Sequence, residues 1–256
     1  MEKVLITGCS SGFGLKTALL LAEHHFEVVA TTRHSNFSFN HPNITHQYLD
    51  MKNIPEEMDD YDIVIFNAGV LDAGLAENIA NSSIDEMMEV NVASIMKLSK
   101  LIIPKMKEKK KGKLIFISSM AAIRPLPNLS VYNASKAAIE AYAKSLYLEL
   151  APFNIEVYLI ESGFYNTSLW DNVKENTDKY AQILSDLGKN SQKNRNVEEV
   201  TFQILKICEG KSKSLHHPIT LTNRLMFICK PFIYTKIGKT LFKSIIFKFQ
   251  NMKTQK

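Results

Sequence analysis

The sequence has few cysteines and no long apolar run, and these two features exclude several classes of protein. Its three cysteines, Cys9, Cys208 and Cys229, lack the spacing of a zinc site. A small, odd number of cysteines indicates reduced thiols in a cytoplasmic protein rather than a disulfide framework. No stretch reaches the roughly 20 apolar residues that a membrane-spanning helix needs. A strand-like run begins at Lys3, so we expect no signal peptide.

The chain also lacks internal repeats and low-complexity linkers. Of its 256 residues, 45% are hydrophobic, which is enough to build a full core. This length is normal for a single doubly wound α/β domain. We expect one domain over residues 1–221, followed by an extension over residues 222–256.

Short apolar runs typical of buried strands alternate with helical stretches. The strand-like runs are Val4–Thr7, Glu27–Ala30, Ile63–Phe66, Leu114–Ile117 and Ile155–Ile160, and the helical stretches are Leu15–His24, Ser83–Lys107 and Asn133–Leu150. This alternation predicts a parallel sheet with helices on both faces.

A glycine-rich turn follows the first strand and opens the first helix. It reads Thr7-Gly8-Cys9-Ser10-Ser11-Gly12-Phe13-Gly14, with the spacing G-x-x-x-G-x-G. Glycines let the backbone approach a pyrophosphate, and a helix N-terminus adds N–H donors and the positive end of a dipole. The turn predicts a dinucleotide site, with an ordinary glycine turn as the alternative. Cys9 is expected to face the core as a small filler.

No acidic residue follows the second strand, where NAD enzymes hold the ribose hydroxyls. The residues there are Ala30-Thr31-Thr32-Arg33-His34. The guanidinium of Arg33 is a planar donor suited to a phosphate, and Ser11 can add a hydroxyl contact. We predict NADP as the cofactor. The alternatives are NAD as the cofactor and Arg33 as a solvated surface residue.

Tyr132 and Lys136 lie four residues apart at the start of a predicted helix, so they share one face. An ammonium at ~4 Å can lower the pKa of a phenol by up to about three units at an effective dielectric of ~20, and an oxidised nicotinamide acts in the same direction. A tyrosine tuned in this way exchanges a proton with a substrate hydroxyl or carbonyl. Ser119, thirteen residues earlier and just past a buried strand, can hydrogen-bond to the same oxygen.

The Y-x-x-x-K spacing occurs a second time, at Tyr48 and Lys52, and Ser35 lies thirteen residues before Tyr48. That pair is in a loop-like stretch after His41-Pro42, and no strand presents Ser35. The strand–loop–helix context therefore favours the pair of Tyr132 and Lys136, because the spacing alone does not separate the two.

Taken in order, these motifs resemble the classical short-chain dehydrogenases/reductases over about residues 3–210. The motifs are Thr7-Gly8-x-x-x-Gly12-x-Gly14, Asp50 after the third strand, Asn67-Ala68-Gly69, Asn91, Ser119 and Tyr132-x-x-x-Lys136. The resemblance implies a Rossmann-type sheet of order 3-2-1-4-5-6-7. It also implies that Asp50 touches adenine, that Asn67-Ala68-Gly69 lies along the adenosine, and that Asn91 positions Lys136 and a water that relays protons. Ala30-Thr31-Thr32-Arg33 and Ile160-Glu161 are most similar to the retinol and 17β-hydroxysteroid branch.

The chain departs from the family after the sixth strand. The usual Pro-Gly is replaced by Ser162-Gly163, while Gly163 and Thr167 keep their places as cofactor contacts. Proline would fix a backbone angle that serine leaves free. We therefore expect a less constrained nicotinamide loop with unchanged chemistry.

The family resemblance also implies that a third strand ends at Asp50 and that the fourth ends just before Asn67. Between these two strands, only residues 51–61, which include Pro55, remain to form a helix. The third crossover helix should therefore be short or absent.

Two segments differ from the rest of the chain. Residues 168–196, which include Trp170, are polar and without a clear period, so they are a candidate substrate lid or a long surface excursion. Residues 211–256 carry ten Lys or Arg and no Asp or Glu. Within them, Lys239–Phe249 shows an apolar stripe beside lysines. Such a helix lies on an anionic bilayer, or it packs on its own domain or a second subunit.

These observations predict an NADP(H)-dependent oxidoreductase that interconverts an alcohol and a carbonyl, on a small and hydrophobic substrate. We expect a cytoplasmic homodimer or homotetramer, with peripheral membrane contact through residues 222–256 as an option. No nucleic acid is expected, because no recognition motif accompanies the basic charge. No metal is expected, since His216 and His217 lack partner ligands and should lie at the surface. The alternative is a non-catalytic nucleotide-sensing or scaffold protein on the same fold.

Overall fold

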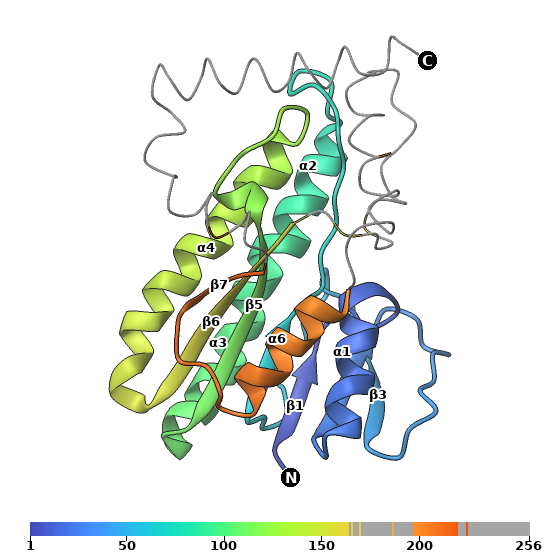
Figure 1. Cartoon of the computed structure of the whole chain (residues 1–256). Coiled ribbons are helices and arrows are strands. Elements are labelled where there is room, and N and C mark those ends of the chain that lie inside the picture. Colours follow the sequence, from blue (N-terminus) through green and yellow to red (C-terminus); the bar gives the residue numbers. More distant parts are fainter. Residues whose placement is uncertain (164, 166–168, 170–185, 187–196, 220–223, 225–256) are drawn as a thin grey trace.

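The computed structural model describes residues 1–163, 165, 169, 186, 197–219 and 224. Within them, one parallel sheet of seven strands has the order β3-β2-β1-β4-β5-β6-β7 (Figure 1). Its strands are β1 Lys3–Ile6, β2 Glu27–Thr32, β3 Ile44–Tyr48, β4 Ile63–Phe66, β5 Gly112–Ser119, β6 Ile155–Ser162 and β7 His216–Pro218. The predicted Rossmann-type order and parallel pairing are confirmed.

Helices cover both faces of this sheet, as the alternation of strands and helices predicts. They are α1 Gly12–Glu23, α2 Asn81–Met88, α3 Ser94–Lys109, α4 Ser130–Leu150 and α6 Glu198–Cys208. Successive residues of a strand point to opposite faces. In β1, Val4 and Ile6 therefore pack in the layer with α1 and α6, and Leu5 packs in the layer with α3 and α4.

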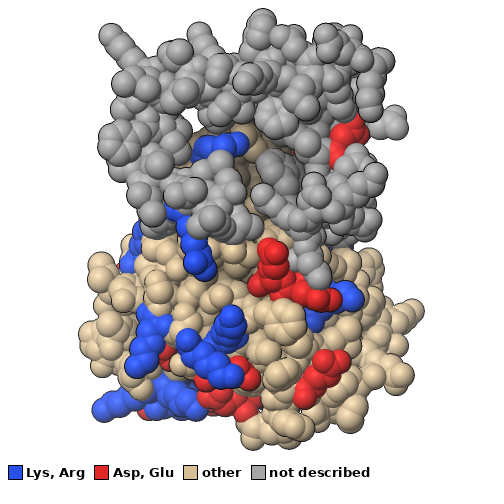
Figure 2. Space-filling view, viewed as in Figure 1, with Lys and Arg blue, Asp and Glu red and all other residues tan. Residues whose placement is uncertain are grey.

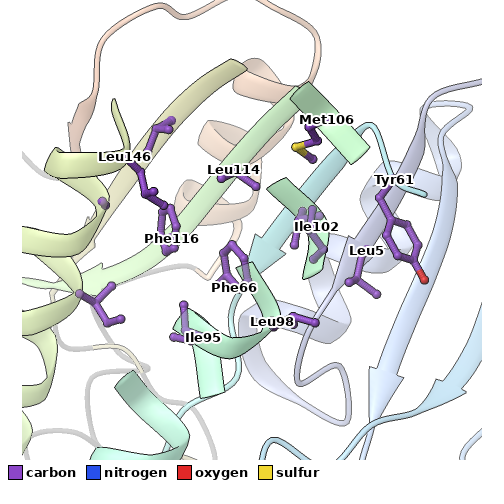
Figure 3. Packing of buried hydrophobic residues seen from close by; sticks show 14 of the residues in the cluster. Leu5, Tyr61, Phe66, Ile95, Leu98, Ile102, Met106, Leu114, Phe116 and Leu146 are labelled. Atoms are coloured by element: carbon purple, nitrogen blue, oxygen red, sulfur yellow. The ribbon is translucent and has the colours of Figure 1, made fainter. Parts of the chain in front are cut away.

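The core on the α3 and α4 side is built from large side chains (Figure 3). Phe66 of β4 stacks on Phe116 of β5, with ring centroids 4.7 Å apart. Ile95 and Leu98 of α3 and Leu146 of α4 belong to the same buried cluster. Burying side chains of this size contributes about 1.5–3 kcal/mol each. This layer fixes α4, and with it Tyr132 and Lys136, against the sheet.

One predicted helix is interrupted in the structure. The stretch expected over residues 83–107 divides into α2 and α3, with a π-helical turn over Glu89–Ala93 between them. Single π turns inside helices are often found at functional sites. Here the wide turn holds Asn91, whose side chain is fully buried.

Residues 49–62, all of which the structure describes, form no helix between β3 and β4, so the expectation for the third crossover is confirmed. Lysines of α3 hold this connection in place: Lys105 donates to the Met58 carbonyl oxygen at 2.7 Å, and Lys109 pairs with Asp60 at 2.8 Å. Met58 and Tyr61 of this connection are buried. At the lower end of the view in Figure 2, basic side chains lie beside acidic ones, in line with such pairs.

Two sequence-based expectations about local structure were wrong. Tyr48 is not in a loop but ends β3, an edge strand whose polar residues hid it from the apolar pattern. His216 and His217 do not lie free at the surface but belong to β7. Glu161, which is fully buried, accepts a hydrogen bond from the backbone N–H of His217 at 2.9 Å and contacts the His216 ring. This partner lies 55 residues earlier in the chain, so the local sequence could not reveal it.

Several predicted features lie outside the described residues. They are Thr167, Trp170, Cys229, nearly all of the candidate lid over residues 168–196, and the extension over residues 222–256 apart from Arg224. In the described part of the chain, no helix is long and apolar enough to cross a bilayer. The same residues contain no group of His, Cys, Asp or Glu that could hold a metal ion.

Candidate active site

A groove lies at the carboxyl ends of the parallel strands, where open α/β sheets bind their ligands. Its cavity measures about 220 Å³. Predicted site residues that line it are Gly8, Ser10, Ser11, Gly12, Phe13, Arg33, Asp50, Asn67, Ala68, Gly69, Tyr132 and Lys136. The structure thus brings residues from five separate segments of the sequence to one surface. Gly14, Asn91, Ser119 and Gly163 are not part of this lining.

Close packing explains the glycines in the first turn. Gly8 has φ +74°, and a Cβ there would lie 2.8 Å from the Cα of Ala68. A Cβ on Gly14 would lie 2.3 Å from the carbonyl oxygen of Gly8. Helix α1 begins at Gly12 and has no acidic residue in its first turn. The turn therefore presents a helix N-terminus whose first turn carries no carboxylate, which fits a pyrophosphate.

Thr7 and Asn67 lock the turn after β1 to the turn after β4. The Thr7 hydroxyl oxygen accepts from the backbone N–H groups of Asn67 and Ala68, each at 3.0 Å. The Asn67 side-chain amide donates to the carbonyl oxygens of Thr7 and Gly8, each at 2.9 Å. The sequence identified Asn67 but not the role of Thr7. A threonine directly before the first glycine was the available signal.

Cys9 is fully buried in the core beneath α1 and α6, as expected. Its backbone N–H donates to the Thr31 carbonyl oxygen at 2.8 Å, which ties the glycine turn to β2. Burial raises the pKa of the Cys9 thiol far above its usual range. The thiol is therefore protonated at neutral pH and serves packing rather than chemistry.

Arg33 and Asp50 lie at the end of the groove formed by β2 and β3. β2 ends at Thr32, whose hydroxyl accepts from the backbone N–H of His34 at 3.1 Å and so shapes the turn that carries Arg33. The Asp50 carboxylate accepts from the backbone N–H of Lys52 at 3.0 Å and from the Asn53 side chain at 3.3 Å. Asp50 thus closes a turn as well as lining the groove.

The opposite end of the groove holds the residues predicted to be catalytic. Ser119 is the last residue of β5, and Tyr132 and Lys136 lie on one face of α4. The side chains of Ser119 and Tyr132 are hydrogen-bonded to each other. The Lys136 ammonium donates to the Ile117 carbonyl oxygen at 3.0 Å and lies 5.8 Å from the centroid of the Tyr132 ring. This is the arrangement that proton exchange with a substrate oxygen requires.

Burial dominates the acid–base properties of this end. It raises the pKa of Tyr132 to about 12, although the hydrogen bond with Ser119 acts in the opposite direction. It also lowers the pKa of Lys136 to about 8. In the chain alone, the pKa of the Tyr132 phenol is therefore raised, and not lowered by Lys136 as the sequence predicted. A dry environment disfavours both charged forms, and it is the largest cause of both shifts.

Asn91 reaches the same region from the π-helical turn. Its side-chain oxygen accepts from the Val70 N–H at 2.8 Å, and its amide donates to the Val70 carbonyl oxygen at 2.9 Å and to the Ser135 hydroxyl at 3.1 Å. Ser135 donates in turn to the Tyr132 carbonyl oxygen at 2.8 Å. The described contacts of Asn91 therefore reach α4 through Ser135, and the implied positioning of Lys136 stays a prediction. Ser135 was missed because a serine inside a helix carries no signal of its own.

Serine restrains the end of β6 in a way that the sequence did not suggest. β6 continues through Ser162, which pairs in register with Ser119. The buried Ser162 hydroxyl donates to the Ser118 carbonyl oxygen at 3.2 Å. Strand pairing and this bond therefore restrain Ser162 itself. Most of the nicotinamide loop that follows lies outside the described residues, so the expectation of a less constrained loop stays a prediction.

The alternative tyrosine–lysine pair has a different setting. The Tyr48 side chain is 57% exposed, and Lys52 pairs with Glu86 at 2.6 Å. Tyr48 does not line the groove. The geometry thus agrees with the choice of Tyr132 and Lys136.

Comparison with known proteins gives matches along most of the chain. The family model described as short chain dehydrogenase matches residues 44–178. A 3-ketodihydrosphingosine reductase of Bacteroides thetaiotaomicron is 31% identical over 251 residues, which cover 92% of this chain and 87% of the relative. Human retinol dehydrogenase 8 is 29% identical over 179 residues, which cover 62% of this chain and 58% of that protein.

Solved structures share the fold at lower identity. A 3-ketoacyl-(acyl-carrier-protein) reductase from Brucella melitensis, complexed with NADH, has a TM-score of 0.70 and 23% identity, and covers 84% of this chain and 93% of its own. The closed form of a serine dehydrogenase complexed with NADP⁺ has a TM-score of 0.70 and 21% identity, with the same coverage. At these identities the likeness shows the fold alone, and the two neighbours differ in cofactor.

Proposed function

The chain belongs to the short-chain dehydrogenase family and is an NAD(P)-dependent oxidoreductase acting on CH–OH groups, and from this premise we propose that it uses NADP(H) and a hydrophobic substrate. The observation that carries the proposal is the contact between Ser119 and Tyr132 beside a buried Lys136, at one end of a groove that begins at the glycine turn. A nucleotide-sensing or scaffold protein would not need this buried acid–base group.

We assign the chemistry as follows. When bound, the nicotinamide supplies or accepts the hydride. In carbonyl reduction, the Tyr132 hydroxyl gives its proton to the carbonyl oxygen, and the Ser119 hydroxyl donates a hydrogen bond to the same oxygen. Lys136 in its charged form stabilises the phenolate that remains. In alcohol oxidation the proton moves the other way, from the substrate hydroxyl to Tyr132.

We also assign the groove residues to the parts of the cofactor that they would bind. The N-terminus of α1, with Ser10 and Ser11, holds the pyrophosphate. Arg33 binds the 2′-phosphate of NADP(H), because its planar guanidinium suits a phosphate and no acid follows β2 to repel one. The adenosine lies along Asn67-Ala68-Gly69 near Asp50, while Gly163 and Thr167 contact the nicotinamide half.

The substrate class rests on the relatives. One is named a 3-ketodihydrosphingosine reductase and another a retinol dehydrogenase, and both names denote apolar molecules with one reacting oxygen. We propose that the present chain acts on a substrate of this kind and that it forms a homodimer or homotetramer. Residues 222–256 are proposed to bring the enzyme to a membrane surface.

Tyr132→Phe tests the assignment, because it removes the proton donor and keeps the ring in place. Turnover of a panel of apolar ketones with NADPH should fall at least about 100-fold, while cofactor binding is retained. Tyr48→Phe is the matched control, since Tyr48 has the same spacing to a lysine and should have little effect. Equal losses in both variants, or no loss in Tyr132→Phe, would refute the proposal. A wild-type chain that binds NADPH without turnover of any ketone would favour the non-catalytic alternative.

A further inference from the structure

A second cavity adjoins the cofactor groove on the side of β2 and β3. It measures about 330 Å³ and shares Arg33, Lys52 and Val70 with the main cavity. Its outer wall includes Ser82 and Glu86 of α2. Two cationic side chains, from segments 19 positions apart in the sequence, therefore border the place where the two cavities meet.

The backbone holds Lys52 at this junction. The Asp50 carboxylate accepts from the Lys52 N–H at 3.0 Å and from the Asn53 side chain at 3.3 Å, which fixes the turn that carries Lys52. Both residues line the second cavity, and the Lys52 ammonium lies 2.6 Å from the Glu86 carboxylate. The two side chains are 46% and 40% exposed, so water screens their attraction.

We propose that Lys52 is a second cation for the 2′-phosphate of NADP(H), and that it leaves Glu86 to bind this phosphate together with Arg33. The inference rests on the proposed use of NADP(H). A phosphate monoester carries a charge of about −1.5 to −2 and three acceptor oxygens at neutral pH, whereas Glu86 offers a single charge. An exposed lysine–carboxylate pair has little stability to lose, so the phosphate displaces Glu86 readily.

The exchange gives Glu86 a defined role. With no phosphate present, Glu86 keeps Lys52 paired and at the junction of the cavities. During binding it competes with the phosphate, because both anions need the same ammonium. Removal of Lys52 and removal of Glu86 should therefore change the affinity for a 2′-phosphate in opposite directions.

The test measures binding directly, with the full chain free of cofactor and at low salt. The probes are adenosine 2′,5′-bisphosphate and adenosine 5′-monophosphate, which differ by the 2′-phosphate alone. In isothermal titration, Lys52→Ala should weaken the bisphosphate about tenfold, the size of one contact to a charged group, and leave the monophosphate within about twofold. Glu86→Gln should tighten the bisphosphate by about twofold or more, and this gain should be largely lost in the Lys52→Ala background.

Lys97→Ala is the matched control. Lys97 pairs with Glu89 at 2.8 Å, and its side chain is 57% exposed, but neither residue lines the two cavities. Neither probe should respond to this change. If Lys52→Ala weakens both probes equally or neither, or if Glu86→Gln weakens the bisphosphate, the inference is overturned. If instead the wild-type chain binds the two probes equally well, the proposed use of NADP(H) fails before Lys52 is tested.

Discussion

Thr7→Val removes one oxygen atom that links the turn after β1 to the turn after β4, and it nearly preserves the shape of the side chain. That oxygen accepts hydrogen bonds from the N–H groups of Asn67 and Ala68, each at 3.0 Å. Thr7 is fully buried, so valine would leave both N–H groups away from water. An unpaired buried donor costs about 1–3 kcal/mol. The free energy of unfolding should therefore fall by about 2–5 kcal/mol.

The assay is equilibrium unfolding in urea, supported by thermal melting. For a chain of this size about 1 kcal/mol corresponds to 2–4 °C, so the melting temperature should fall by roughly 5–15 °C. The Michaelis constant for the cofactor should rise as well, because the two turns are no longer locked together.

Thr17→Val is the control, since it makes the same chemical change at an equally buried site. The Thr17 hydroxyl in α1 has no hydrogen-bond partner in the described part of the chain. Valine should therefore be neutral there or stabilise by up to about 1 kcal/mol. Equal destabilisation in the two variants would refute the argument, because the loss could then not be assigned to the pair of N–H groups.

Other substitutions test the remaining parts of the groove. Arg33→Asp should reverse the cofactor preference, measured as the ratio of kcat/KM for NADPH and NADH, and a wild-type ratio favouring NADH would contradict the assignment outright. Gly14→Ala should lower the melting temperature and abolish cofactor binding, because the new Cβ would lie 2.3 Å from the Gly8 carbonyl oxygen, and a variant that melts and binds normally would contradict this. Lys136→Met should abolish turnover yet stabilise the fold at pH 7 by about 1–3 kcal/mol, because burial lowers the Lys136 pKa from 10.5 to about 8 and the unfolded chain binds more protons between these values. The gain should shrink as pH rises from about 8 to 10.5, and a gain independent of pH would argue against this origin. Truncation after Leu221 should remove salt-sensitive binding to anionic vesicles, whereas a lower melting temperature without any vesicle binding of the full chain would identify a structural extension.

The sequence revealed most of the sheet because its central strands are buried on both faces and read as apolar runs. β1, β4, β5 and β6 were all recognised in this way. The two edge strands were not: β3 is half polar, and β7 consists of His216, His217 and Pro218. Edge strands are held by contacts that are distant in sequence, as Glu161 holds β7, and a local pattern does not record them.

The site shows the same difference between what local sequence predicts and what distant contacts determine. The strand–loop–helix context of the motif selected Ser119, Tyr132 and Lys136, and the end of β5 and α4 bring these residues together through regular geometry. The bonds that support them could not be predicted, since Thr7 and Ser135 act through partners in other segments. The direction of the pKa shifts was also out of reach, because it depends on how completely α4 is buried against the sheet.

The two ends of the groove are built on opposite electrostatic conditions. At the proposed adenosine end, the side chains of Lys52 and Glu86 are about half exposed, so charges there are screened and exchange partners easily. At the proposed reaction end, Tyr132 and Lys136 are buried, and the dry environment pushes both toward their neutral forms. A charge that arrives beside Tyr132 therefore has a larger effect on its pKa than the same charge would have in water. Changes at the first end should alter mainly affinity, and changes at the second mainly the rate of proton exchange.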